Sequence, residues 1–183
     1  LVPMARAVIT RVEELTDVAK GAKPPLTGDL HMGVIPTIGP FLLPRVLPGL
    51  RATYPALRLY LREEKTADLL QALAAGTLDL VLMALPYATD KMETFAIADD
   101  PLLAVFPRGH PMAKFETMTP ARLGRSPLLL LEEGNCLTAQ TLAMGKHSIS
   151  LAPGQFQATS LHTLIQMVEN GLGLTVLPKM AVD

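Results

Sequence analysis

The sequence predicts an α/β protein built from two subdomains, because short apolar strands and amphipathic helices alternate along most of the chain. Between residues 29 and 85 the expected order is strand, helix, strand, helix, strand, which is typical of a parallel sheet with right-handed crossovers. A second set of strands and helices follows from residue 95. Hydrophobic residues make up 49% of the 183 residues, which allows a substantial core and argues against a disordered chain.

The chain opens with a predicted helix that ends in a linker. Apolar side chains within residues 4–20 recur close to the helical period, at Ala7, Val8, Val12, Leu15 and Val18. The stretch from Gly21 to Gly28 is rich in glycine and proline, and such a stretch ends a helix. We therefore expect residues 1–22 to be the C-terminal part of a linker helix that enters from an upstream domain.

Residues 23–98 are expected to form the first subdomain. Its predicted elements are a strand at 29–35, a helix at 40–54, a strand at 57–64, a helix at 66–76 and a strand at 78–85. In the first of these helices Pro40 suits the first turn, whereas Pro48 is expected to kink the helix. The run at 78–85 is almost wholly apolar, which favours a buried parallel strand.

Residues 99–183 are expected to form the second subdomain. The first predicted element begins at residue 95, slightly before this boundary. The predicted elements are a strand, turn and strand at 95–107, a short helix near 119–124, a strand at 127–134, a helix at 135–145, a strand at 156–160, a helix at 160–171 and a strand at 172–178. The chain crosses between the two halves near residues 98–101. We therefore expect a ligand cleft between the carboxyl ends of their strands.

Composition and charge argue against several classes of protein. The formal net charge is -1, and the basic residues form no cluster of the kind that binds nucleic acid. One cysteine cannot form an internal disulfide framework, and the four histidines have no metal-binding spacing, so neither a metal nor a cofactor is expected. The opening residues are too charged for a signal peptide, and no apolar run approaches the roughly 20 residues that span a bilayer. We expect a cytoplasmic location.

Residues 28–85 resemble the start of the effector-binding domain of LysR-type transcriptional regulators. The shared features are a strand that ends in a Pro-Thr turn, a helix that begins Leu-Leu-Pro, a Tyr-Pro pair before the second strand, and a leucine-rich helix followed by Gly-Thr-Leu-Asp. Residues 158–178 resemble a later strand, helix and strand of the same family. The resemblance implies two Rossmann-like subdomains of the periplasmic-binding-protein type. It also implies that the family domain runs further and returns to the first subdomain, so this chain is expected to be C-terminally incomplete.

Three shorter runs resemble the OxyR proteins, the peroxide-sensing members of that family: HMGVIPTIGPFLLP, LEEGNCL and FQATSL, at 31–44, 131–137 and 156–161. This resemblance implies that Cys136 is the peroxidatic cysteine and that Thr37, Thr66 and Asn135 bind and orient peroxide. Asn135 stands where the OxyR pattern has histidine. Gly145 stands where it has the resolving cysteine, so the chain is engineered at these positions or has lost two-cysteine chemistry.

The residues around Cys136 allow two interpretations. A lone cysteine is commonly an inert small hydrophobic residue. Cys136, however, follows Gly134 and Asn135 at the predicted start of a helix, where partial positive charge and free N–H groups stabilise a thiolate. Nearby Glu132 and Glu133 oppose thiolate formation. A thiolate reacts with peroxide to give a sulfenic acid, and we favour this redox interpretation.

The threonines also have two interpretations. Thr37 and Thr66 each precede or begin a predicted helix, so each is a candidate helix cap as well as a candidate ligand-binding hydroxyl. Thr159 and Ser160 precede the predicted helix at 160–171 in the same way. Thr138 and Ala139 stand where the OxyR pattern has a charged pair, so this chain departs from that pattern directly after Leu137.

We therefore expect a peroxide-sensing or effector-sensing domain that is not an enzyme. By resemblance it binds DNA only through an upstream winged helix-turn-helix, and it forms a dimer of these domains and a tetramer of the full-length protein. The many apolar residues of the helix at 40–54 also predict a homodimer through that helix. Three alternatives stay open: a LysR-type domain that binds a small metabolite anion, a solute-binding protein of a transporter, and a thiol enzyme that uses Cys136.

Overall fold

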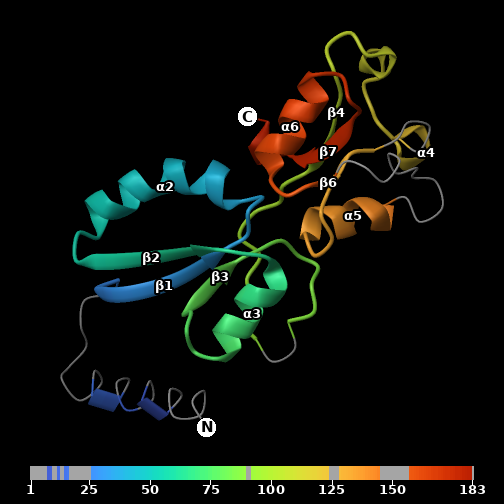
Figure 1. Ribbon diagram of the computed structural model, residues 1–183. Helices are drawn as coiled ribbons and strands as arrows, with labels where there is room; N and C mark the ends of the chain where they lie inside the picture. Colours follow the sequence, from blue (N-terminus) through green and yellow to red (C-terminus); the bar gives the residue numbers. More distant parts are fainter. Residues whose placement is uncertain are drawn as a thin grey trace. The chain divides into compact units, whose positions relative to one another are not determined.

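The chain divides into two compact units, Leu1–Met92 and Glu93–Asp183, and each unit is described by itself (Figure 1). The computed structural model describes residues 26–89, 92–123, 128–144 and 157–182, together with five residues nearer the N-terminus. These five are Val8, Ile9, Val12, Leu15 and Thr16, and all of them are helical. The rest of the predicted linker helix at 1–22 lies outside the described residues.

The first unit contains a three-stranded parallel sheet. Its strands are β1 (Gly28–Val34), β2 (Leu57–Glu63) and β3 (Leu80–Leu82), in the order β2-β1-β3. Helices α2 (Gly39–Thr53) and α3 (Thr66–Ala74) lie on opposite faces of this sheet (Figure 1). The alternation of strand and helix predicted for this half of the chain is confirmed, with boundaries within a few residues of those expected.

Helix α2 continues through two internal prolines. Pro40 lies in its first turn, where a missing N–H costs nothing, while Pro44 and Pro48 lie inside the helix. The helix nevertheless extends to Thr53, whose hydroxyl donates to the Gly49 carbonyl over 2.9 Å. Pro40 therefore marks where the helix begins, while Pro44 and Pro48 do not end it early.

Helix α3 packs very closely against the sheet at Gly33. A Cβ atom at this position would lie only 2.8 Å from side-chain carbons of Leu69 and Leu78, both of which are buried. Glycine is therefore the residue that lets α3 approach β1 so closely. Leu69 is on α3, so this contact holds the first half of that helix against the carboxyl half of β1.

Strand β3 is shorter and more exposed than the sequence predicts. The strand comprises Leu80–Leu82 instead of 78–85, and Leu80 is 38% exposed. Among the described residues β3 pairs with β1 alone, so it lies at an edge of the sheet. The expectation of a fully buried strand is wrong because an apolar run does not reveal whether its strand has neighbours on both sides.

The second unit is also α/β. Its strands are β4 (Leu102–Val105), β5 (Leu130–Leu131), β6 (Gln157–Ala158) and β7 (Thr175–Pro178). Its helices are α4 (Pro120–Leu123), α5 (Cys136–Met144), α6 (Leu161–Glu169) and two short 3₁₀ helices, η1 (Pro111–Lys114) and η2 (Lys179–Ala181). Strand β4 is antiparallel to β7, β5 is parallel to β6, and a parallel bridge between Leu128 and Leu174 connects the two ladders.

A buried apolar cluster of this unit comprises Leu123 of α4, the bridging pair Leu128 and Leu174, and Val176 of β7. The hydroxyl of buried Thr175 donates to the Leu129 carbonyl over 2.8 Å, so the β5 and β7 segments are tied together by a side chain as well. Ser160 caps α6 by accepting a hydrogen bond from the Thr163 amide over 3.2 Å. The capping role proposed for Ser160 is therefore confirmed.

One predicted strand of the second unit is not formed. The described stretch from Met92 to Pro101 contains no strand, although a strand was expected to begin at residue 95. Phe95 and Ile97 are 80% and 73% exposed. Alternating apolar residues form a strand only where another strand pairs with them, and none does so within the described residues. None of the helices in the described part of the chain is long and apolar enough to span a membrane.

Candidate functional site

Cys136 is the first residue of α5, where the chain leaves the carboxyl end of β5. Residues 132–135 form the connection, and Gly134 has a φ of 89°, a left-handed conformation that glycine adopts without strain. Cys136 is partly exposed. The helix and its predicted start are thus confirmed, and they place a thiol in the first turn of a helix, beside the partial positive charge of its N-terminus.

A small network of hydrogen bonds closes this connection. The Asn135 amide N–H and side-chain Nδ2 both donate to the Glu132 carbonyl, over 3.4 and 3.1 Å. The Thr138 hydroxyl donates to the Leu131 carbonyl over 2.9 Å, and the Glu132 amide donates to the Ala158 carbonyl of β6 over 3.0 Å. The start of α5 is therefore bound to the end of β5, which is itself bound to β6.

Asn135 lies directly before Cys136 and is buried, with 7% of its surface exposed. Because its side-chain amide donates to the Glu132 carbonyl, that amide has a structural part in the turn. Its predicted part in binding peroxide stays a prediction. Gly145, the position of the absent resolving cysteine, lies outside the described residues.

Thr37 and Thr66 belong to the first unit, unlike Asn135 and Cys136. Thr37 follows β1 and Thr66 follows β2, so both lie at the carboxyl edge of one parallel sheet, where ligands of open α/β folds bind. Both are buried, at 4% and 2% exposure. Neither is the capping residue of its helix: the N-cap positions of α2 and α3 are Ile38 and Lys65, without a side-chain cap. The capping interpretation of these two threonines is therefore wrong.

The hydroxyl of Thr66 is unusual among the polar groups of the described residues. It is the one buried side-chain oxygen there that has no hydrogen-bond partner. An unsatisfied buried hydroxyl costs free energy, so such a group in a folded protein needs an explanation. A small polar ligand that hydrogen-bonds to it is one such explanation.

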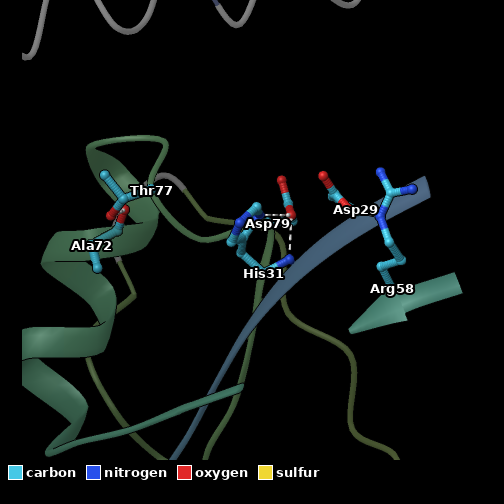
Figure 2. Close-up of polar contacts among 6 residues, drawn as sticks. All are labelled: Asp29, His31, Arg58, Ala72, Thr77 and Asp79. Carbon is cyan, nitrogen blue, oxygen red and sulfur yellow. Dashed lines mark hydrogen bonds and ion pairs between the residues drawn. The ribbon is translucent and has the colours of Figure 1, made fainter. Parts of the chain in front are cut away.

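A second polar cluster lies at the opposite, amino end of the same sheet (Figure 2). Arg58 Nε donates to Asp29 Oδ1 across β1 and β2, and this bond lowers the pKa of Asp29 below its ordinary value. The His31 amide donates to Asp79 Oδ2 over 2.7 Å, and the His31 ring stacks on Tyr60 with centroids 4.8 Å apart. These contacts were not predicted, because they depend on the register of the strands.

The described residues contain no group of three or more histidine, cysteine, aspartate or glutamate side chains that could hold a metal ion. From the sequence, Thr138 was noted only because it departs from the OxyR pattern, and no structural role was predicted for it. The available signal was a hydroxyl on the fourth residue of the predicted helix at 135–145, which directly follows a predicted strand. The sequence could not show that the hydroxyl reaches that strand.

Comparison with known proteins identifies the class to which the two units belong. Residues 24–183 match the LysR substrate binding domain, and the chain belongs to this family. The chain is 39% identical over 182 residues to the DNA-binding transcriptional dual regulator OxyR of Escherichia coli, a match that covers 100% of this chain and 60% of that protein. It is 38% identical to a probable hydrogen peroxide-inducible genes activator of Mycobacterium leprae, covering 99% of this chain and 58% of that protein.

Solved OxyR structures have the same fold. The crystal structure of the reduced form of OxyR superposes with a TM-score of 0.77 at 41% identity, over 86% of this chain and 74% of that one. A hydrogen-peroxide-bound cysteine-to-serine mutant of Corynebacterium glutamicum OxyR gives 0.80 at 34% identity, over 97% and 57%. The α/β fold class and the resemblance to OxyR are therefore confirmed. The chain spans about 60% of the length of the curated relatives it matches.

Proposed function

We propose that this chain is the sensing domain of an OxyR-like LysR-type transcriptional regulator and that it detects hydrogen peroxide through oxidation of Cys136. The observation that carries the proposal is the position of Cys136, the only cysteine of the sequence, at the N-terminus of α5. The 39% identity of the chain to OxyR of Escherichia coli, over 182 residues, supports the same assignment.

The proposed reaction is a single displacement at oxygen. The Cys136 thiolate attacks one oxygen of hydrogen peroxide, an S–O bond forms and the O–O bond breaks. The second oxygen leaves as hydroxide and takes up a proton to become water. Sulfur loses two electrons and becomes a sulfenic acid, while the peroxide is reduced. Because the chain has one cysteine, the sulfenic acid cannot form an internal disulfide, and an outside thiol must restore it. One peroxide molecule oxidises one Cys136, and the domain is proposed to use this single oxidation as a signal and not to act as an enzyme.

Thr37, Thr66 and Asn135 are proposed to bind and orient the peroxide. The unpartnered hydroxyl of Thr66 supports this role, since a bound peroxide oxygen would satisfy it. Thr37 lies at the same edge of the sheet, at the carboxyl end of β1. Asn135 lies directly before Cys136 in the second unit, and this position next to the reacting cysteine supports its proposed role in binding peroxide.

The whole regulator is proposed to bind DNA through an upstream winged helix-turn-helix and to act in the cytoplasm. The net charge of -1 supports the view that this domain itself does not hold the duplex, because phosphate neutralisation by basic residues drives such binding. The domain is proposed to form a homodimer, and the full-length protein a tetramer. Helix α2 supports the dimer: of its fifteen residues Gly39 alone is buried, and Val46 is 47% exposed.

Mass spectrometry of Cys136 tests the proposed function. After a brief exposure to micromolar hydrogen peroxide and trapping with dimedone, we expect most of the chain to carry the dimedone adduct at Cys136. A Cys136→Ser variant, treated in the same way, should gain no adduct. If Cys136 stays a free thiol under conditions that oxidise a low-reactivity model thiol, the peroxide-sensing proposal is wrong.

One alternative has an observation in its favour. A LysR-type domain that binds a small metabolite anion would need no second cysteine, and this chain has none. In that case Cys136 would resist peroxide, and a set of small organic anions would include one that raises the melting temperature of the chain. The same oxidation experiment therefore separates the two functions.

A further inference from the structure

Two buried threonines of α5 use their hydroxyl groups in different ways. Thr141, fully buried, donates to the Leu137 carbonyl over 2.7 Å, one turn earlier in the same helix. Thr138, 7% exposed, donates to the Leu131 carbonyl over 2.9 Å, and Leu131 belongs to β5. The first bond stays within the helix, whereas the second one joins the helix to the sheet.

The bond from Thr138 completes a set of attachments on both sides of Cys136. Leu131 and Glu132 are consecutive residues at the end of β5. The Leu131 carbonyl accepts the Thr138 hydroxyl, and the Glu132 carbonyl accepts two bonds from Asn135. Cys136 lies between Asn135 and Thr138, so the residues before and after it are both bound to the strand end.

The end of β5 is itself hydrogen-bonded to the neighbouring strand β6. Leu131 is 3% exposed and pairs in register with Ala158 of β6, and the next amide, that of Glu132, donates to the Ala158 carbonyl. Because the Thr138 hydroxyl is buried, water does not readily replace it at the Leu131 carbonyl. Removal of this hydroxyl would release one of the two attachments while leaving the rest of α5 intact.

We infer that Thr138 is a positioning residue for Cys136: its hydroxyl fixes the first turn of α5 on β5 and thereby holds the thiolate in place for attack on peroxide. The inference depends on the proposed function, since it assigns a supporting residue to the same reaction. Displacement requires an aligned approach of sulfur to oxygen, and a misplacement of about 1 Å can slow such a reaction about 100-fold. Thr138 also stands at a position where the chain departs from the OxyR pattern, so its hydroxyl is a feature of this sequence.

Matched valine variants of the 183-residue chain test the inference. Valine keeps the shape of threonine and removes the hydroxyl. We expect Thr138→Val to slow the reaction of Cys136 with hydrogen peroxide at neutral pH about tenfold or more. Thr141→Val, which loses an equally buried hydroxyl from the same helix, should stay within about twofold of the unmodified chain. The single cysteine makes the mass-spectrometric rate unambiguous.

Two further measurements separate positioning from a general loss of structure. Alkylation of Cys136 by iodoacetamide at a pH of about 10, where ordinary cysteines are ionised, should proceed equally fast in all variants. Thr138→Ser, which keeps the hydroxyl, should restore the peroxide rate, whereas Thr138→Ala should not. This serine and alanine pair decides the question even if the valine variant does not fold.

The outcomes distinguish the two proposals. If the unmodified chain reacts with peroxide and Thr138→Val or Thr138→Ala reacts equally fast, the positioning role is overturned and the proposed function stands. Equal slowing by Thr138→Val and Thr141→Val also overturns the positioning role. If Cys136 of the unmodified chain does not react at all, the proposed function fails and this inference fails with it.

Discussion

Thr66 and Thr138 are both buried threonines near the start of a helix, and their hydroxyl groups have opposite surroundings. Thr138 donates to a strand carbonyl, so its hydroxyl is satisfied and attaches α5 to β5. The Thr66 hydroxyl has no partner among the described residues. The hydrogen bond of Thr138 stabilises the connection between β5 and α5. The unsatisfied hydroxyl of Thr66 lowers the stability of the chain when no ligand is bound. Residues of binding sites commonly lower stability in this way.

Substitution of Thr66 by valine should therefore stabilise the chain while impairing its response. Valine has the same shape and removes the unsatisfied hydroxyl, so the free energy of unfolding should rise by about 1–3 kcal/mol. Oxidation of Cys136 by peroxide should become slower. Urea denaturation and dimedone trapping measure the two effects. The control is Thr141→Val, which removes a satisfied hydroxyl and should lower the free energy of unfolding by about 0.5–1.5 kcal/mol. A loss of stability in Thr66→Val would show that the hydroxyl has a partner in the folded chain.

At the scale of secondary-structure elements, the first sheet carries different chemistry at its two ends. Thr37 and Thr66 lie at the carboxyl ends of β1 and β2, where the proposed ligand binds. Asp29 and Arg58 form a directly opposed pair at the amino ends of the same strands (Figure 2). One end of the sheet is therefore proposed for recognition, while the other end has an exposed ion pair that connects the two strands.

The Asp29–Arg58 pair predicts a specific pH dependence. The bond from Arg58 lowers the pKa of Asp29 in the folded chain from its ordinary value of 3.8. The stabilisation is therefore fully present above about pH 4 and is lost as the pH falls through the lowered pKa. Asp29→Asn should unfold slightly more easily than the unmodified chain at pH 7, and the difference should vanish in acid. Because the pair is exposed, 1 M salt should also reduce the difference. A difference that persists unchanged at pH 2 would contradict this account.

At the scale of the whole molecule, helix α2 carries more apolar surface than its own unit buries. Val46 of α2 is exposed, as are Tyr60 and Leu61 of the neighbouring edge strand β2. Exposed apolar residues on a surface helix and on an edge strand of the same unit are common at protein interfaces. A second copy of the chain is the partner proposed for this surface.

A charge placed in this helix should weaken the proposed homodimer. We expect Val46→Glu to raise the dimer dissociation constant about tenfold or more, because a carboxylate would be buried on association. Leu142→Glu is the matched control, since Leu142 is similarly exposed at 41% but belongs to α5 of the other unit. Sedimentation equilibrium measures both variants. A chain that stays monomeric at every concentration, or equal weakening by both substitutions, would exclude α2 as the interface.

Several predictions from the sequence are confirmed because they depend on local patterns. Helices α2 and α5 begin at Gly39 and Cys136, where glycine, proline and asparagine follow the preceding strand. The strand predicted at 78–85 is shorter and more exposed than expected, and the strand expected from residue 95 is not formed, both for the opposite reason. Their apolar residues indicate that a strand is possible, but pairing depends on neighbours that are distant in sequence. Leu80 and Phe95 are exposed as a result.

The sequence by itself therefore determined the α/β class, the family and the place of Cys136 at the start of a helix. Short-range periodicity, turn residues and motif spacing carry this information, and all of these can be read within a few residues. The tertiary structure alone decided that the Thr66 hydroxyl has no partner among the described residues, that Thr138 reaches Leu131, and that Asp29 opposes Arg58. Each of these facts depends on how strands and helices pack together, and a side chain finds or loses its hydrogen-bond partner only when that packing forms.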